Sequence, residues 1–117
     1  MGWEFANSNG YIRLTFRPSA TQINLSIGGL LVVGNWYMGT MTYDNTTARI
    51  YLNGVQVGST TSGGPVTLNS TQPLNIGRRI QGQYYNGNIS STQIYNRALT
   101  ASEIQQNFNA TRSRFGI

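Results

Sequence analysis

The chain has 117 residues, of which 38% are apolar and only 9% are charged, and its net charge is +5. It contains no cysteine and no histidine, which excludes disulfides, thiolate nucleophiles, imidazole acid–base chemistry and zinc sites built from these ligands. The length predicts a single domain over residues 1–117, and the low apolar content suits a sheet protein with a solvated outer face.

All eight basic residues are arginines, and they are scattered along the chain. This scattering favours a surface that is poor in acids over a track for nucleic acid. We expect no nucleic-acid partner; the alternative uses Arg78 and Arg79 beside Tyr84 and Tyr85, on which bases would stack. No apolar run reaches the ~20 residues of a membrane helix, so we also expect no membrane partner.

Short alternating runs separated by turn residues predict strands in the first half of the chain. In residues 48–53, for example, Ala48, Ile50 and Leu52 share one face. The predicted strands in this half are residues 3–5, 11–16, 22–27, 36–43, 48–53 and 55–59, with a short apolar piece at residues 30–33. Asn53-Gly54 between two such runs is a strong signal for a tight hairpin.

The second half carries weaker strand patterns and then one helix signal. Residues 66–68, 74–76 and 88–95 are predicted strands, with a loop at residues 77–87, which brings the total to about nine strands. Thr100 followed by Glu103 matches a capping box, and Leu99 is placed to contact Ile104 across the helix start. A helix over residues 101–109 is therefore expected to end the fold.

Three stretches carry a resemblance to a known family: NWYMGTMTYDNTTARIYLNGVQVGS, PLNIGRR and YYNGNISSTQIYNRALTASEIQQNF. In this order and spacing they resemble the laminin-G-like branch of the concanavalin A-like lectin/glucanase superfamily. The resemblance covers residues 30–110 well and the start poorly. It implies an all-β, jelly-roll β-sandwich (concanavalin A-like), truncated at the N-terminus, with one short C-terminal helix.

The shortened start has a consequence for assembly. Losing the first strands of a closed sandwich leaves a sheet edge exposed, and such edges are costly. We therefore expect a homo-oligomer, in which another copy or a rearranged N-terminus covers the edge, and Trp3 is a candidate for a subunit contact. Residues 107–117 also resemble the ending of such domains in phage structural proteins, which implies a virion or extracellular surface.

The acidic residues decide against catalysis. Glycosidases of the superfamily pair two carboxylates on one strand, whereas this chain has three acids in all, and no predicted strand carries two. We expect no enzyme. Asp44 is the one candidate calcium ligand, with Asn45 or Asn86 as neutral helpers, but a turn residue is the favoured interpretation of Asp44, and we assign no cofactor.

Aromatic and amide side chains give the candidate binding site. Arg79, Tyr84, Tyr85 and Asn86 fall in the glycine-flanked loop, where aromatic faces stack on sugars and polar groups bind hydroxyls. The competing interpretation has one tyrosine packed on the sandwich end and the other solvated, and Trp36 is assigned to the core. The sequence thus predicts a non-catalytic binding or assembly module that recognises glycan or a virion or capsid protein; the alternative is a purely structural decoration or oligomerisation domain.

Overall fold

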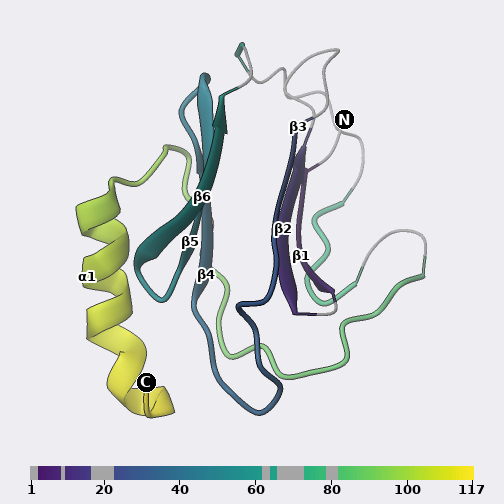
Figure 1. Cartoon of the computed structure of the whole chain (residues 1–117), viewed down its shortest axis with the longest axis vertical. Helices are drawn as coiled ribbons and strands as arrows, with labels where there is room; N and C mark the ends of the chain where they lie inside the picture. The colour runs from purple at the N-terminus through teal and green to yellow at the C-terminus, as the bar shows by residue number, and fades with distance from the viewer. Residues whose placement is uncertain (1–2, 9, 17–22, 62–63, 66–72, 79–81) are drawn as a thin grey trace.

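The computed structural model describes residues 3–8, 10–16, 23–61, 64–65, 73–78 and 82–117. They form two antiparallel sheets packed face to face, with a helix on the outer side of one of them (Figure 1). The first sheet holds β1 (Trp3–Ser8), β2 (Tyr11–Phe16) and β3 (Ile23–Ile27) in that order. The second holds β4 (Gly39–Tyr43), β5 (Thr47–Leu52) and β6 (Val55–Thr61). This confirms the predicted β-sandwich, with each described sheet running as a meander.

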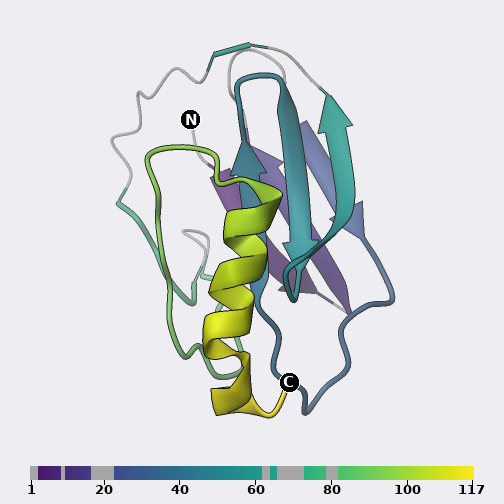
Figure 2. The ribbon, with the colours of Figure 1, turned by 90° about the vertical axis from the view of Figure 1, so that its left-hand side faces the viewer.

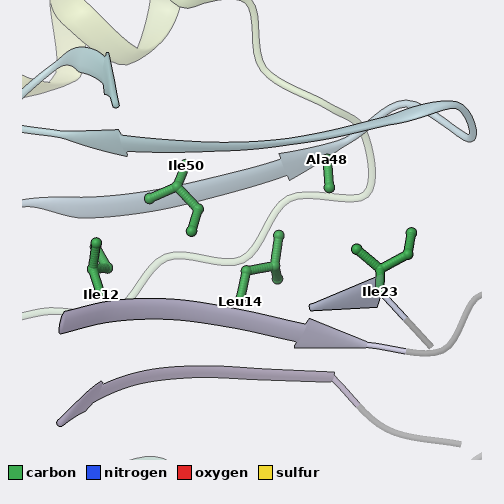
Figure 3. Close-up of a cluster of buried hydrophobic side chains, with 5 residues drawn as sticks. All are labelled: Ile12, Leu14, Ile23, Ala48 and Ile50. Carbon is green, nitrogen blue, oxygen red and sulfur yellow. The ribbon is translucent and has the colours of Figure 1, made fainter. Parts of the chain in front are cut away.

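The core between the sheets follows from the alternation in the strands. Ile12, Leu14 and Ile23 of the first sheet meet Ala48 and Ile50 of the second (Figure 3). All five side chains are buried, and burying each aliphatic group removes apolar surface from water.

A second, smaller core lies on the other face of the second sheet. The helix α1 (Ala101–Thr111) covers this face and continues into a 3₁₀ turn, η1 (Arg112–Phe115) (Figure 2). Tyr51 points to this side of β5 and is buried with Leu99 and Ile104. β5 is therefore the one described strand with apolar burial on both faces.

The predicted local signals at Asn53-Gly54 are confirmed. Asn53 and Gly54 both have positive φ, 51° and 82°, which matches the right-handed twist of a two-residue hairpin between β5 and β6. Asn53 also exchanges two hydrogen bonds with Met38, because its N–H donates to the Met38 carbonyl and its Oδ1 accepts from the Met38 N–H, both at 2.9 Å.

The capping box is also confirmed. Thr100 Oγ1 accepts from the Glu103 N–H at 3.2 Å, and Glu103 Oε2 accepts from the Thr100 N–H at 2.9 Å. Two helix-start donors are thereby satisfied reciprocally. Leu99 and Ile104 share the second core, as expected.

Several predicted elements differ from the structure. Residues 74–76 and 88–95 form no strand among the described residues, and residues 66–68 lie outside them. In residues 88–95 the two isoleucines, Ile89 and Ile94, are five positions apart and would face opposite sides of a strand. No described strand adjoins this segment, so no ladder forms to compensate for its weak pattern.

Trp36 is not a core residue, contrary to prediction. β4 begins at Gly39 rather than at residue 36, so Trp36 lies on the preceding loop with 37% of its surface exposed. Its ring packs against Phe115 of η1, with 5.0 Å between the ring centroids. The apolar piece at residues 30–33 is likewise a loop.

Candidate functional site

The predicted glycan loop is closed by its own backbone. Arg78 and Tyr84 form an isolated antiparallel bridge, and the Tyr85 N–H donates to the Gly77 carbonyl at 2.8 Å. Gly77 and Gly82 take positive φ of 76° and 81°, which glycine adopts without the Cβ penalty. The residues on either side of the loop are therefore held next to one another, and the tyrosines have a defined backbone position.

The two tyrosines of the loop differ in how they are held. Tyr84 has 74% of its surface exposed. Tyr85 lies against Gly87, where an added Cβ would come within 2.8 Å of the Tyr85 ring. The Gly87 backbone therefore supports the Tyr85 ring, while 44% of that residue's surface stays exposed. Asn86, between Tyr85 and Gly87, is exposed.

The arginine next to these tyrosines is Arg78. Arg79, the arginine predicted for the site, lies outside the described residues. Arg78 sits across the bridge from Tyr84, and its Nε donates to Asn75 Oδ1 at 3.1 Å. Asn75 in turn donates from Nδ2 to the Pro73 carbonyl at 3.1 Å. Arg78 and Asn75 were missing from the predicted glycan set; in the sequence, the turn-favouring Gly82 between Arg78 and Tyr84 was the signal for their pairing.

Exposed apolar side chains precede and follow the loop in the chain, and Ile89 lies next to Gly77. We call Leu74, Ile76, Ile89 and Ile94 the apolar ridge; all four are exposed. Contiguous exposed apolar surface marks interaction sites more often than an isolated exposed residue does. Residues 88–95 also take part in no backbone–backbone hydrogen bond within the described part of the chain. The region thus offers aromatic rings, polar donors and a segment whose backbone has no backbone partner among the described residues.

Asp44 is held as a turn residue. Its Oδ1 accepts from the backbone N–H groups of Thr46 and Thr47 at 3.1 and 2.8 Å, and its Oδ2 pairs with Arg49 Nη1 at 2.6 Å. The Arg49 guanidinium, followed by the Thr47 N–H, holds the pKa of Asp44 well below its usual range. A calcium ion at this carboxylate would have to displace Arg49, so the turn interpretation is the one that the geometry supports.

Glu103 is likewise occupied. Arg97 Nη1 and Nη2 donate to Glu103 Oε2 and Oε1, each at 2.8 Å, in addition to the capping box. This bidentate contact, together with the Thr100 N–H, lowers the pKa of Glu103 to about 2. The two carboxylates Asp44 and Glu103 thus each serve local structure. Among the described residues no group of three or more His, Cys, Asp or Glu is arranged to hold a metal ion.

None of the helices in the described part of the chain has both the length and the apolar character needed to cross a bilayer.

Comparison with known proteins places the chain in a family. The crystal structure of residues 221–444 of an S-layer domain-containing protein from Clostridium thermocellum is similar, with a TM-score of 0.60 and 28% sequence identity. The match covers 85% of this chain and 52% of that one, so the chain spans about half the length of the related structure. No curated protein sequence matches the chain significantly.

The family model for the concanavalin A-like lectin/glucanases superfamily, in its laminin-G-like form, matches residues 2–105. The match begins at residue 2 and therefore includes the first sheet, which the sequence motifs covered poorly. With two packed antiparallel sheets and a C-terminal helix as its architecture, the chain belongs to the concanavalin A-like lectin/glucanases superfamily.

Proposed function

We propose that the chain is a non-catalytic binding module of an extracellular or virion surface, and that it recognises glycan at the loop that carries Tyr84, Tyr85 and Asn86. The observation that carries the proposal is the pair of exposed tyrosine rings beside Arg78 and Asn75. Aromatic faces stack on the apolar faces of sugars, while guanidinium and amide groups bind hydroxyls. Arg79 belongs to the same loop and is proposed as a further donor.

Family membership and carboxylate placement support a non-catalytic role. Glycoside hydrolysis needs two carboxyl groups that flank one bond. Asp44 is engaged by Arg49 in the β4–β5 turn, whereas Glu103 is engaged by Arg97 at the start of α1. The related Clostridium thermocellum protein is described as S-layer domain-containing, which supports a surface location for this chain.

A glycan array with the 117-residue chain tests this proposal. We expect saccharide hits that are lost in Tyr84→Ala and Tyr85→Ala, because each substitution removes a stacking surface. Tyr11→Ala is the matched control, since Tyr11 has 49% exposure against 44% for Tyr85 and lies on β2. Hits that survive both loop substitutions, or an inert array, would contradict the glycan proposal.

The apolar ridge favours a second candidate, a structural role in assembly. Four exposed apolar side chains and a segment, residues 88–95, that has no backbone partner within the described part of the chain suit strand addition by another copy of the chain. On a virion this would be a decoration or oligomerisation domain bound to a neighbouring copy or capsid protein.

Light scattering tests the assembly candidate. We expect a defined homo-oligomer that dissociates in the double variant Ile89→Ser/Ile94→Ser. A monomeric wild-type chain at low protein concentration would exclude it, and this result leaves the glycan proposal intact.

A further inference from the structure

One end of the molecule displays apolar side chains that neither proposed function uses. The loop of residues 28–38, between β3 and β4, lies at this end together with η1, and both views show them next to each other (Figures 1 and 2). Val33 is fully exposed at 102%, and Val32 is 61% exposed. We call Tyr11, Val32, Val33 and Trp36 the apolar end.

The loop is fixed in the conformation that exposes the valines. The Val32 N–H donates to the Tyr37 hydroxyl at 3.0 Å, and the Asn35 N–H donates to the Val32 carbonyl at 3.3 Å. Gly34 takes a positive φ of 91° and so allows the turn. Two adjacent valines directed into water carry a hydration cost, and local hydrogen bonds hold them there.

The aromatic residues of this end are seated on the fold. The Tyr11 ring lies so close over Gly28 that an added Cβ would come within 2.3 Å of it. The Leu31 N–H donates to the Gly10 carbonyl at 3.4 Å, which ties the β1–β2 turn to the loop. Trp36 packs on Phe115, as described above. The two exposed aromatic residues thus flank the valine turn.

The charged side chains described at this end are arginines. Arg112 and Arg114 belong to η1; Arg112 lies 5.0 Å over the Phe108 ring, and its Nε donates to the Ile117 main-chain oxygen at 2.6 Å. Glu103 is in the first turn of α1, nine residues before Arg112, which corresponds to roughly 14 Å of helix.

The other two acids are also remote from this end. Asp44 follows β4, at the far end of a five-residue strand, so about 17 Å separates it from the loop that precedes Gly39. Glu4 pairs with Thr15, four residues up β1 from Ser8 and the turn that contacts Leu31. Arginines and apolar groups therefore face solvent at an end where no described segment contributes an acid.

We propose that the apolar end docks onto the surface of an anionic lipid bilayer. Val32 and Val33 enter the boundary between headgroups and acyl chains, Trp36 and Tyr11 lie at headgroup level, and Arg112 and Arg114 face the phosphates. Aromatic residues favour this interface, and basic residues are attracted to anionic lipids. The proposal departs from the expectation of no membrane partner and is independent of the glycan proposal.

Charge and shape favour a bilayer over other occupants. A second copy docked end to end would bring the two pairs of arginines together, which repel each other. A soluble polyanion would pair with the arginines but leave the protruding valines in water. A bilayer satisfies both groups at once.

Vesicle co-sedimentation with phosphatidylcholine vesicles, with and without 30% phosphatidylserine, tests the proposal. We expect partition onto the anionic vesicles, about tenfold weaker in Val32→Ser/Val33→Ser because two partly buried valines are lost. Arg114→Gln lowers it about fivefold. Val55→Ser is the matched control, since Val55 on β6 is 62% exposed against 61% for Val32, and it leaves partition unchanged.

Fluorescence supplies a second readout. In a Trp3→Phe background, Trp36 emission shifts to the blue with anionic vesicles, and brominated lipids quench it. The proposal is overturned if wild-type chain does not partition, or if the double valine variant partitions as well as wild type. It is also overturned if dextran sulfate binds wild type and the valine variant equally and abolishes vesicle binding, since the site would then take a polyanion.

Discussion

The second sheet with its helix and the stretch from residue 73 to residue 98 are built in opposite ways. β5 is buried on both faces, by Ile50 toward the first sheet and by Tyr51 toward α1. Residues 82–98 lie outside the named strands and helices, and most of their side chains are exposed. The first region stabilises the fold, whereas the second exposes polar and aromatic side chains to solvent. A chain of this size thus uses its limited apolar content on one scaffold and leaves a long connection largely exposed to solvent.

Ile50→Ala against Ile94→Ala gives the largest expected contrast between the two regions. Ile50 is fully buried, so its truncation leaves a cavity and lowers the free energy of unfolding by about 2–5 kcal/mol. Ile94 is exposed, and its truncation changes that free energy by less than about 0.5 kcal/mol. Urea denaturation followed by tryptophan fluorescence measures both. Equal losses would mean that residues 88–95 carry part of the core.

Gly54→Ala sharpens the comparison at the contact between hairpin and helix. An added Cβ would lie 3.2 Å from Phe108 Cβ and 3.3 Å from Gln105 Cα, in a residue with positive φ. Strain at positive φ costs about 1–2 kcal/mol, and the displaced helix adds to this loss in the free energy of unfolding.

Gly29→Ala is its control. Gly29 has a similar positive φ of 74°, but an added Cβ meets nothing within 4 Å. Thermal or urea denaturation measures the loss of unfolding free energy in each variant. The difference between the two losses is the part that comes from the contact with the helix. Identical losses in both would show that α1 does not press on the hairpin.

Thr100→Ala tests how the helix is attached where the exposed stretch ends. It removes the oxygen that accepts from the Glu103 N–H and is expected to lower the free energy of unfolding by about 1 kcal/mol. Thr100→Ser keeps that oxygen and should restore most of the loss. If the serine variant is as unstable as the alanine variant, the capping bond is not the cause.

Lowering the pH is expected to have the smallest effect on the free energy of unfolding, and the effect should develop gradually. The folded-state pKa of Glu103 is about 2, below the ordinary value of 4.5, so the stability that its carboxylate contributes is present above pH 4.5 and is lost as the pH falls toward 2. Asp44 acts in the same direction. Both carboxylates are solvated, so salt weakens the effect.

Glu103→Gln is the variant for this titration. Glutamine keeps an acceptor for the Thr100 N–H but loses the charge that binds Arg97, so the fall in the free energy of unfolding between pH 5 and pH 2 should be shallower. A fall as steep as in wild type would assign the acid sensitivity to other groups.

Local signals in the sequence were sufficient for the scaffold. Asn53-Gly54 and the Thr100–Glu103 capping box each specify their geometry through neighbours within a few residues, and both were predicted correctly. Trp36 was wrongly predicted to be a core residue. Whether its side chain belongs to the sheet depends on where β4 begins, and that start is set only by the pairing of β4 with β5. Residues 88–95 were predicted as a strand because propensity cannot show that no described strand pairs with them.

The candidate site was predictable only in part. Glycines flanking Tyr84 and Tyr85 indicated a loop with accessible rings, and both rings are exposed. Arg79 was named for the glycan site and Arg78 was left out, because the bridge from Arg78 to Tyr84 is a property of the closed loop. The apolar end was missed entirely, since residues 30–33 look like a buried strand until the Val32–Asn35 turn is seen.

Amide hydrogen exchange tests most directly the division into a buried scaffold and an exposed connection. At low protein concentration the amides of β5 should exchange slowly, and those of residues 88–95 should exchange at nearly the rate of an unprotected chain. Protection of residues 88–95 that appears only at high concentration would point to strand addition by another copy. Protection equal to that of β5 at low concentration would contradict the account.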